Sequence, residues 1–287
     1  DTGLAKVLMG FLASELSPFP QEDSDSQTPI AGKGTETTET SEAAEAPEPN
    51  DGGAADMLIL MTEGLDMAPS SIIAHRIMAD LYLLLEEYES TVDVARKGLR
   101  NVAEFVRYTG WKSQNTTDAL NITLANALIP YQSPRHHPEA KTIFENILQQ
   151  RPASTDCLLG IGLILKVDQD YQNAVEFLER ALERDPTNVK IRGELFWCKA
   201  LNGDLQAGLD GLQHALESLK AEQHHNKSFK SELLYRVGYC QWHLEPSPAA
   251  RKDRSGAYAS FLASIKANMN YAPAYTSLGF YYADYKK

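Results

Sequence analysis

Three stretches of this chain repeat one spacing pattern every 34 residues, and this period constrains the fold more than any other feature of the sequence. The clearest copy begins at Thr155 and spaces its small and apolar residues as a pair of helices would. They are Leu158, Ile161, Gly162, Leu165, Tyr171, Ala174, Leu178, Ala181 and Leu182, with Pro186 at the end. Further copies begin 34 residues earlier and 34 residues later. A fixed period of about 20 to 50 residues is typical of solenoids, in which each repeat packs against its neighbours.

The pattern resembles the tetratricopeptide repeat, a pair of antiparallel helices. We therefore predict an all-α fold, a tetratricopeptide helix-turn-helix solenoid that winds into a superhelix. Small residues are required where the two helices of a repeat cross closely, and a proline is expected to end the second helix. The residues that we assign to these structural roles are Gly162, Ala174, Ala181, Pro186, Gly238 and Gly279.

We expect one continuous solenoid over residues 1–287, with a linker loop at 106–120. The predicted repeats are 3–71, 72–105, 121–154, 155–188, 189–222, 231–271 with an insert at 245–254, and 272–287. The last of these supplies only a first helix. Because such a helix cannot bury its apolar face alone, we expect the natural protein to continue past Lys287.

The first repeat contains an acidic insert, predicted over residues 17–54, between helices at 4–16 and 54–66. Residues 21–56 hold ten Asp or Glu against one Lys and almost no large apolar side chains. Such a composition cannot bury enough apolar surface to order itself, so we predict a disordered insert. Because most of the net charge of −12 belongs to this insert, the folded part is only mildly acidic.

The sequence does not indicate an enzyme, a metal site or a cofactor. The histidine pairs at 136–137 and 224–225 lie in predicted loops, where adjacent side chains point in different directions. The segment at 32–35 has the glycines of a phosphate loop without its strand, its helix or its spacing. No stretch of about 18 apolar residues suggests a membrane span. The basic residues are scattered without a stripe of interleaved aromatics, so direct nucleic-acid binding is not expected.

Binding to other proteins is the function that the repeats favour. The tetratricopeptide resemblance implies that first helices line a concave groove, and that certain repeat positions point into it. In this chain those positions include Ile129, Leu163, Trp197, Tyr235, Tyr239, Trp242 and Phe280. An apolar groove of this size needs a cover. Either the curvature of the superhelix or another helix of the same protein fills the groove, or a helix or extended segment of a partner protein binds there. The sequence leaves both open.

The C-terminal part, residues 235–244 and 256–285, resembles the tetratricopeptide scaffold subunit family of the superkiller (Ski) complex. The resemblance implies a non-catalytic, cytoplasmic scaffold, with a nuclear pool left open. Its implied partners are a DExH-box RNA helicase, a WD-repeat propeller subunit and, indirectly, the RNA exosome in messenger-RNA decay. Two alternatives remain, an adaptor of the chaperone type and an RNA-binding solenoid. The groove lacks most of the cations with which chaperone adaptors hold an acidic tail, since Ala125, Leu159 and Gly193 occupy such positions and only Arg76 of an earlier repeat has the right sign.

Overall fold

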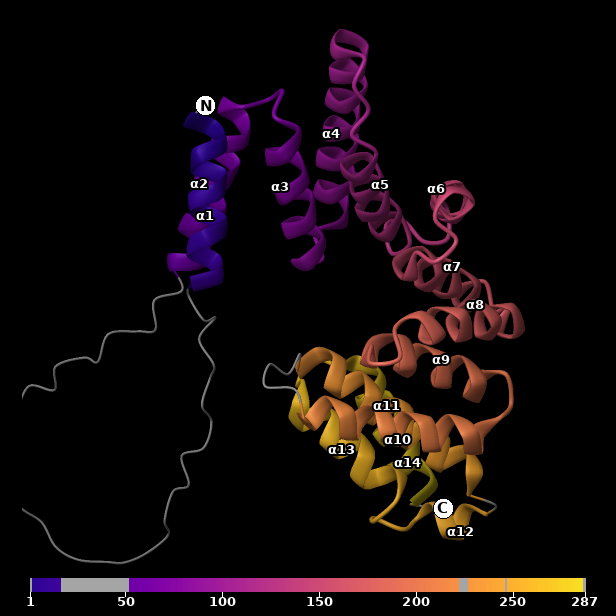
Figure 1. Cartoon of the computed structure of the whole chain (residues 1–287). Coiled ribbons are helices and arrows are strands. Elements are labelled where there is room, and N and C mark those ends of the chain that lie inside the picture. Colours follow the sequence, from indigo (N-terminus) through magenta and orange to yellow (C-terminus); the bar gives the residue numbers. More distant parts are fainter. Residues whose placement is uncertain (1, 17–51, 222–226, 246, 286–287) are drawn as a thin grey trace, which may run out of the picture. The chain divides into compact units, whose positions relative to one another are not determined.

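The structure is a computed structural model that describes residues 2–16, 52–221, 227–245 and 247–285. Every regular element in these ranges is a helix, which confirms the predicted all-α fold (Figure 1). Residues 17–51 of the predicted acidic insert lie outside the described residues. The contacts divide the chain into two compact units, Asp1–Thr123 and Leu124–Lys287.

The first unit contains two helix pairs and the beginning of a fifth helix. The helices are α1 (Thr2–Leu16), α2 (Gly52–Met67), α3 (Ile72–Leu84), α4 (Tyr88–Thr109) and α5 (Gln114–Leu128). α1 packs on α2, and α3 packs on α4. Ser71 caps α3, because its hydroxyl accepts a hydrogen bond from the backbone N–H of Ala74 at 3.3 Å.

The predicted linker loop at residues 106–120 must be corrected. α4 continues to Thr109 and α5 begins at Gln114, so only residues 110–113 lack regular structure. The repeat pattern fades here, but the residues from Val102 to Thr109 contain neither Gly nor Pro and can extend a helix without it. α4 ends at Gly110, which adopts the left-handed conformation with φ of 70°.

The second unit contains the clearest repeats. Its helices are α6 (His137–Gln150), α7 (Thr155–Val167), α8 (Tyr171–Arg184), α9 (Val189–Leu201), α10 (Leu205–Ala221), α11 (Lys227–Leu244), α12 (Pro248–Arg251), α13 (Ala257–Ala267) and α14 (Ala272–Tyr285). α7 pairs with α8, α9 with α10 and α11 with α13. The first helices α7, α9 and α11 also contact one another in succession. The short helix α12 lies within the predicted insert at 245–254.

Close helix crossings depend on residues without bulk. An added Cβ at Gly162 of α7 would lie 2.7 Å from Cγ of Leu178 on α8. At Gly238 of α11 the same atom would lie 2.7 Å from Cε1 of Phe261 on α13. Both distances are shorter than van der Waals contact, so a larger residue would force the helices apart. Ala174 and Ala181 on α8 are fully buried, whereas Pro186 is exposed beyond the end of α8.

Candidate protein-binding groove

Aromatic side chains on one face of α11 line a pocket in the second unit. Tyr235, Tyr239 and Trp242 are spaced by four and three residues, which places them on the same side of the helix. They surround a cavity of about 420 Å³. The other lining residues are His243 of α11, Phe261 of α13, and Pro273, Thr276, Ser277 and Phe280 of α14. The pocket therefore lies between a first helix and the first helix of the next repeat.

Contacts between aromatic rings hold the pocket walls in place. The ring of Tyr235 lies 5.6 Å from Tyr271 and 6.0 Å from Phe261. Trp197 of α9 contacts Tyr239 edge to face at 5.1 Å. Aromatic pairs with this separation stabilise each other beyond the area that they bury. Trp197 thus supports the pocket from the preceding repeat without lining it.

The structure brings five of the seven predicted groove residues together. Trp197, Tyr235, Tyr239 and Trp242 are half-buried around the pocket, and Phe280 at its edge is 65% exposed. Leu163 is a half-buried residue of α7 and does not line this pocket. Gly279 is exposed, and an added Cβ there would meet nothing within 4 Å. The close crossing that we expected at Gly279 is therefore not formed among the described residues.

The predicted place of Ile129 on a first helix must also be corrected. α5 ends at Leu128, so Ile129 follows the helix, and it is only 9% exposed. Pro130 explains the early end, because a residue before proline is disfavoured in the α conformation. The carbonyl of Ile129 lies 3.1 Å from Nε2 of His137, which is buried and also contacts Asp168. Ile129 therefore belongs to a packed turn.

The pocket is lined without Asp, Glu, Lys or Arg. Among the lining residues, only His243 ordinarily titrates near neutral pH. Burial and the positive charge of Arg251 lower the pKa of His243. Burial also raises the pKa of Tyr239. Each of these shifts favours the neutral form at pH 7. The pocket is thus suited to apolar and aromatic groups, and none of its lining residues is a Lys or Arg that could hold a carboxylate.

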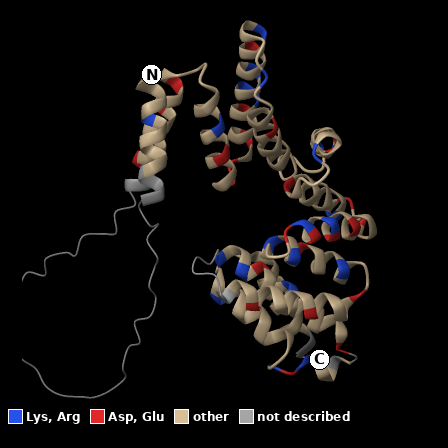
Figure 2. Ribbon diagram, in the orientation of Figure 1, with Lys and Arg blue, Asp and Glu red and all other residues tan. Residues whose placement is uncertain are grey.

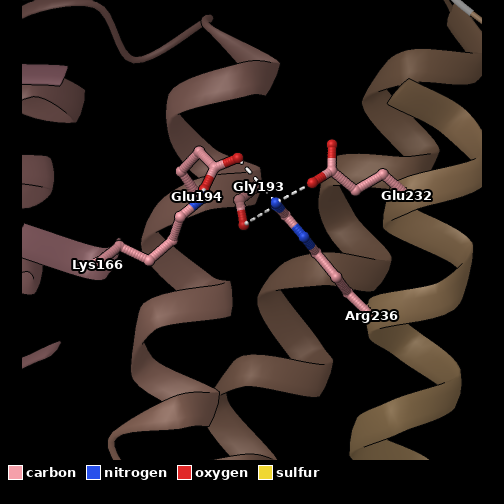
Figure 3. A network of polar contacts seen from close by, with 5 residues as sticks. All are labelled: Lys166, Gly193, Glu194, Glu232 and Arg236. Carbon is pink, nitrogen blue, oxygen red and sulfur yellow. Dashed lines mark hydrogen bonds and ion pairs between the residues drawn. The ribbon is translucent and has the colours of Figure 1, made fainter. Parts of the chain in front are cut away.

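Beneath Trp197 lies a buried ion network that the sequence analysis missed. Arg236 of α11 donates to Oε1 of Glu194 on α9 at 2.8 Å and to the carbonyl of Gly193 at 3.3 Å. Lys166 of α7 donates to the other oxygen of Glu194 at 2.7 Å. Arg236 also pairs with Glu232. Figure 3 shows Glu194 between the two cations. The network therefore connects three successive first helices.

The network also supports the aromatic wall, since the guanidinium carbon of Arg236 lies 5.5 Å from the ring centre of Trp197. A pattern in the sequence could have revealed it. Glu194 and Arg236 are each the sixth residue of a predicted repeat, 189–222 and 231–271. Equivalent positions on neighbouring first helices lie close together, so opposite charges there indicate a pair.

The charge state of Glu194 gives a testable pH dependence. Burial raises its pKa, but the charges and hydrogen bonds of Arg236 and Lys166 outweigh burial and lower the pKa to about 2. A lowered pKa in the folded state stabilises the fold above the unfolded pKa of about 4.3. This contribution, about 3 kcal/mol, should disappear as the pH falls from about 5 to about 2.

Denaturant unfolding of the protein and of its Glu194→Gln variant, followed by circular dichroism between pH 7 and pH 2, would measure this contribution. We expect the variant to be the less stable protein at pH 7 and the difference to shrink below pH 5. A difference that stays constant down to pH 2 would contradict the lowered pKa.

In the described part of the chain, no three His, Cys, Asp or Glu residues gather in a way that could hold a metal ion. The histidines at 224–225 lie outside the described residues. None of the described helices has the length and apolar character that crossing a membrane requires.

Comparison with known proteins agrees with this architecture. A family model described as tetratricopeptide repeat matches residues 168–226. A crystal structure of the Cut9–Hcn1 hetero-tetramer of the APC/C superimposes with a TM-score of 0.65 and 15% identity, covering 81% of this chain and 40% of that one. At this identity the likeness shows the fold alone. The family model thus assigns tetratricopeptide repeats to residues 168–226, and the structural likeness shows the same kind of all-helical fold over most of the described chain.

Two curated proteins extend the resemblance to the superkiller scaffold. Superkiller protein 3 of Saccharomyces cerevisiae is 26% identical over 228 residues, which is 79% of this chain and 16% of that protein. Superkiller protein 3 of Schizosaccharomyces pombe is 28% identical over 273 residues, 95% of this chain and 19% of that protein. The chain therefore spans less than a fifth of the length of these relatives.

Proposed function

We propose that this chain is part of a non-catalytic protein-interaction scaffold, and that the pocket between α11 and α14 binds an apolar segment of a partner protein. The observation that carries this proposal is the pocket itself, where four aromatic side chains predicted to face a groove surround one cavity. Large aromatic residues contribute a disproportionate share of interface energy. A pocket without charged side chains favours a helix or extended segment that presents an apolar anchor.

The partners follow from the resemblance to the superkiller scaffold. We propose a DExH-box RNA helicase and a WD-repeat propeller protein, in an assembly that supplies messenger RNA to the exosome in the cytoplasm. The similarity to superkiller protein 3 from two yeasts supports this assignment. An adaptor of the chaperone type is less favoured, because the pocket has no Lys or Arg with which to bind a terminal carboxylate.

The experiment is an affinity purification from cell extract with the full chain as bait, with and without nuclease, followed by mass spectrometry. Recovery of an RNA helicase and a WD-repeat protein after nuclease treatment would support the proposal, provided that the purified partner then binds the chain directly. Recovery of heat-shock proteins in their place, or only of partners that nuclease removes, would contradict it.

A Phe280→Asp variant tests the pocket. Phe280 is 65% exposed, so the fold should be unchanged, while a carboxylate at the pocket edge should oppose an apolar partner segment. We expect at least a tenfold increase in the dissociation constant of the purified partner, measured by calorimetry. Met269→Asp is the matched control, since Met269 is 70% exposed and does not line the pocket. Equal affinities for both variants would place the partner elsewhere.

A further inference from the structure

The C-terminal end of α4 is exposed and extends past the last buried residue of the helix. α4 has 22 residues and its partner helix α3 has 13. The last buried residue of α4 is Val102, so residues 103–109 form about two turns without a buried side chain. Figure 1 shows this end of α4 projecting past the end of α3 in the first unit. Val106 is the one half-buried residue of this stretch.

Three aromatic rings stand at this projecting end, and Phe105, at 38%, is the least exposed of them. Tyr108 is 77% exposed and Trp111 is 75% exposed. Trp111 follows a capped helix end. The N–H of Gly110 donates to the carbonyl of Val106 at 2.8 Å, and the N–H of Trp111 donates to the hydroxyl of Thr109 at 3.1 Å. These hydrogen bonds fix the backbone conformation at Trp111, so the turn itself keeps the ring exposed.

Positively charged residues follow α4 toward Tyr108 and Trp111. Lys97, Arg100, Arg107 and Lys112 are exposed, and Glu104 is the one acidic residue between positions 97 and 112. No carboxylate of the described residues pairs with these four cations within 4.0 Å. The guanidinium carbon of Arg107 lies 5.2 Å from the ring centre of Tyr108. Figure 2 shows Lys and Arg positions along this part of α4.

The helix gathers residues that look scattered in the sequence. Lys97, Arg100, Glu104 and Tyr108 are separated by three or four residues, which places their Cα atoms along one side of α4. Trp111 follows in the turn after the helix. Arg107 lies beside Tyr108 on the same helical turn. This arrangement was not predicted from the sequence, in which residues 106–120 were expected to form a linker loop.

We propose that this helix end, residues 97–112, binds single-stranded nucleic acid. The exposed rings of Tyr108 and Trp111 would stack on bases, and the four cations would contact phosphates. An apolar protein segment would make no favourable interaction with the four cations. An acidic protein segment would pair with the cations, but it has no flat group that could stack on the rings. A nucleic-acid strand satisfies both features. The site lies wholly within the unit Asp1–Thr123, so its test is independent of the pocket in the second unit.

The test is fluorescence anisotropy of a labelled 12-nucleotide uridine RNA with the full chain at about 50 mM salt, where phosphate contacts are strong. Trp111→Ala should weaken binding about tenfold, the loss expected for one stacked base. Four phosphate contacts predict a slope of about −2.8 for log K against log salt, and Arg107→Gln with Lys112→Gln should reduce it to about −1.4. Because these residues are exposed, circular dichroism should show unchanged helix content.

Two controls complete the experiment. Tyr275→Ala and Lys190→Gln remove an exposed ring and an exposed cation elsewhere, and should leave RNA affinity unchanged. Absence of RNA binding, or a Trp111→Ala variant that binds as tightly as the parent, would overturn the proposal. So would an oligoglutamate peptide that binds as tightly as the RNA, because it would identify an acidic protein segment as the ligand class.

Discussion

Replacing Arg236 with Met should lower the free energy of unfolding of the second unit by about 3–5 kcal/mol. The substitution leaves Glu194 buried with Lys166 as its one remaining cation, and it removes the donor to the carbonyl of Gly193. Breaking a buried ion pair from one side costs more than the pair itself contributes, because a charge stays in a medium of low dielectric constant. The effect should concentrate on α7, α9 and α11, which the network connects.

Denaturant unfolding followed by circular dichroism would measure the total effect, and hydrogen exchange would locate it. Solenoids do not always unfold in one step, so circular dichroism can average over several transitions. Hydrogen exchange at the backbone amides of α9 therefore measures the local loss of stability more directly. Lys190→Met, an exposed substitution on the same helix, should change stability by no more than about 0.5 kcal/mol. Replacing Lys166, Glu194 and Arg236 together with apolar residues should restore part of the loss, because none of the three then leaves a charge without its partner. A cost below about 1 kcal/mol for Arg236→Met would show that the pair is solvated.

Phe261→Ala is the second substitution for which we expect a loss of about 3–5 kcal/mol. The ring of Phe261 is 2% exposed and fills the space opposite Gly238, where α11 and α13 cross. Its removal leaves a cavity that the two helices cannot close without moving toward each other. Because Phe261 also lines the pocket, the cavity should enlarge the pocket and weaken the partner that we propose for it.

Phe280→Ala provides a matched control, since it removes the same ring from a site that is 65% exposed. We expect its thermal unfolding to lie close to that of the parent, within about 0.5 kcal/mol, while Phe261→Ala unfolds at a clearly lower temperature. Equal stabilities of the two variants would show that Phe261 does not belong to the core.

Much of the fold could be predicted from the sequence, since apolar residues at a fixed period define helix pairs through local backbone geometry and neighbour packing. The groove face of α11 could also be predicted from the sequence, because Tyr235, Tyr239 and Trp242 lie on one side of any regular helix that contains them. The prediction failed where a helix boundary departed from the repeat. α5 stops at Leu128 before Pro130, so Ile129 lies in a turn, and α4 continues through residues that carry no repeat pattern.

The sequence by itself determined the all-α architecture and the aromatic character of the first helices. The tertiary structure decided which of these aromatics share a pocket, because Phe280 reaches the pocket only through the packing of α14 against α13. It also decided that Glu194 meets Arg236 and Lys166 away from water. The physical reason is the range of the interactions. Helix formation follows from residues within one or two turns, whereas a pocket or a buried ion pair depends on distances of a few ångströms between side chains far apart in the chain.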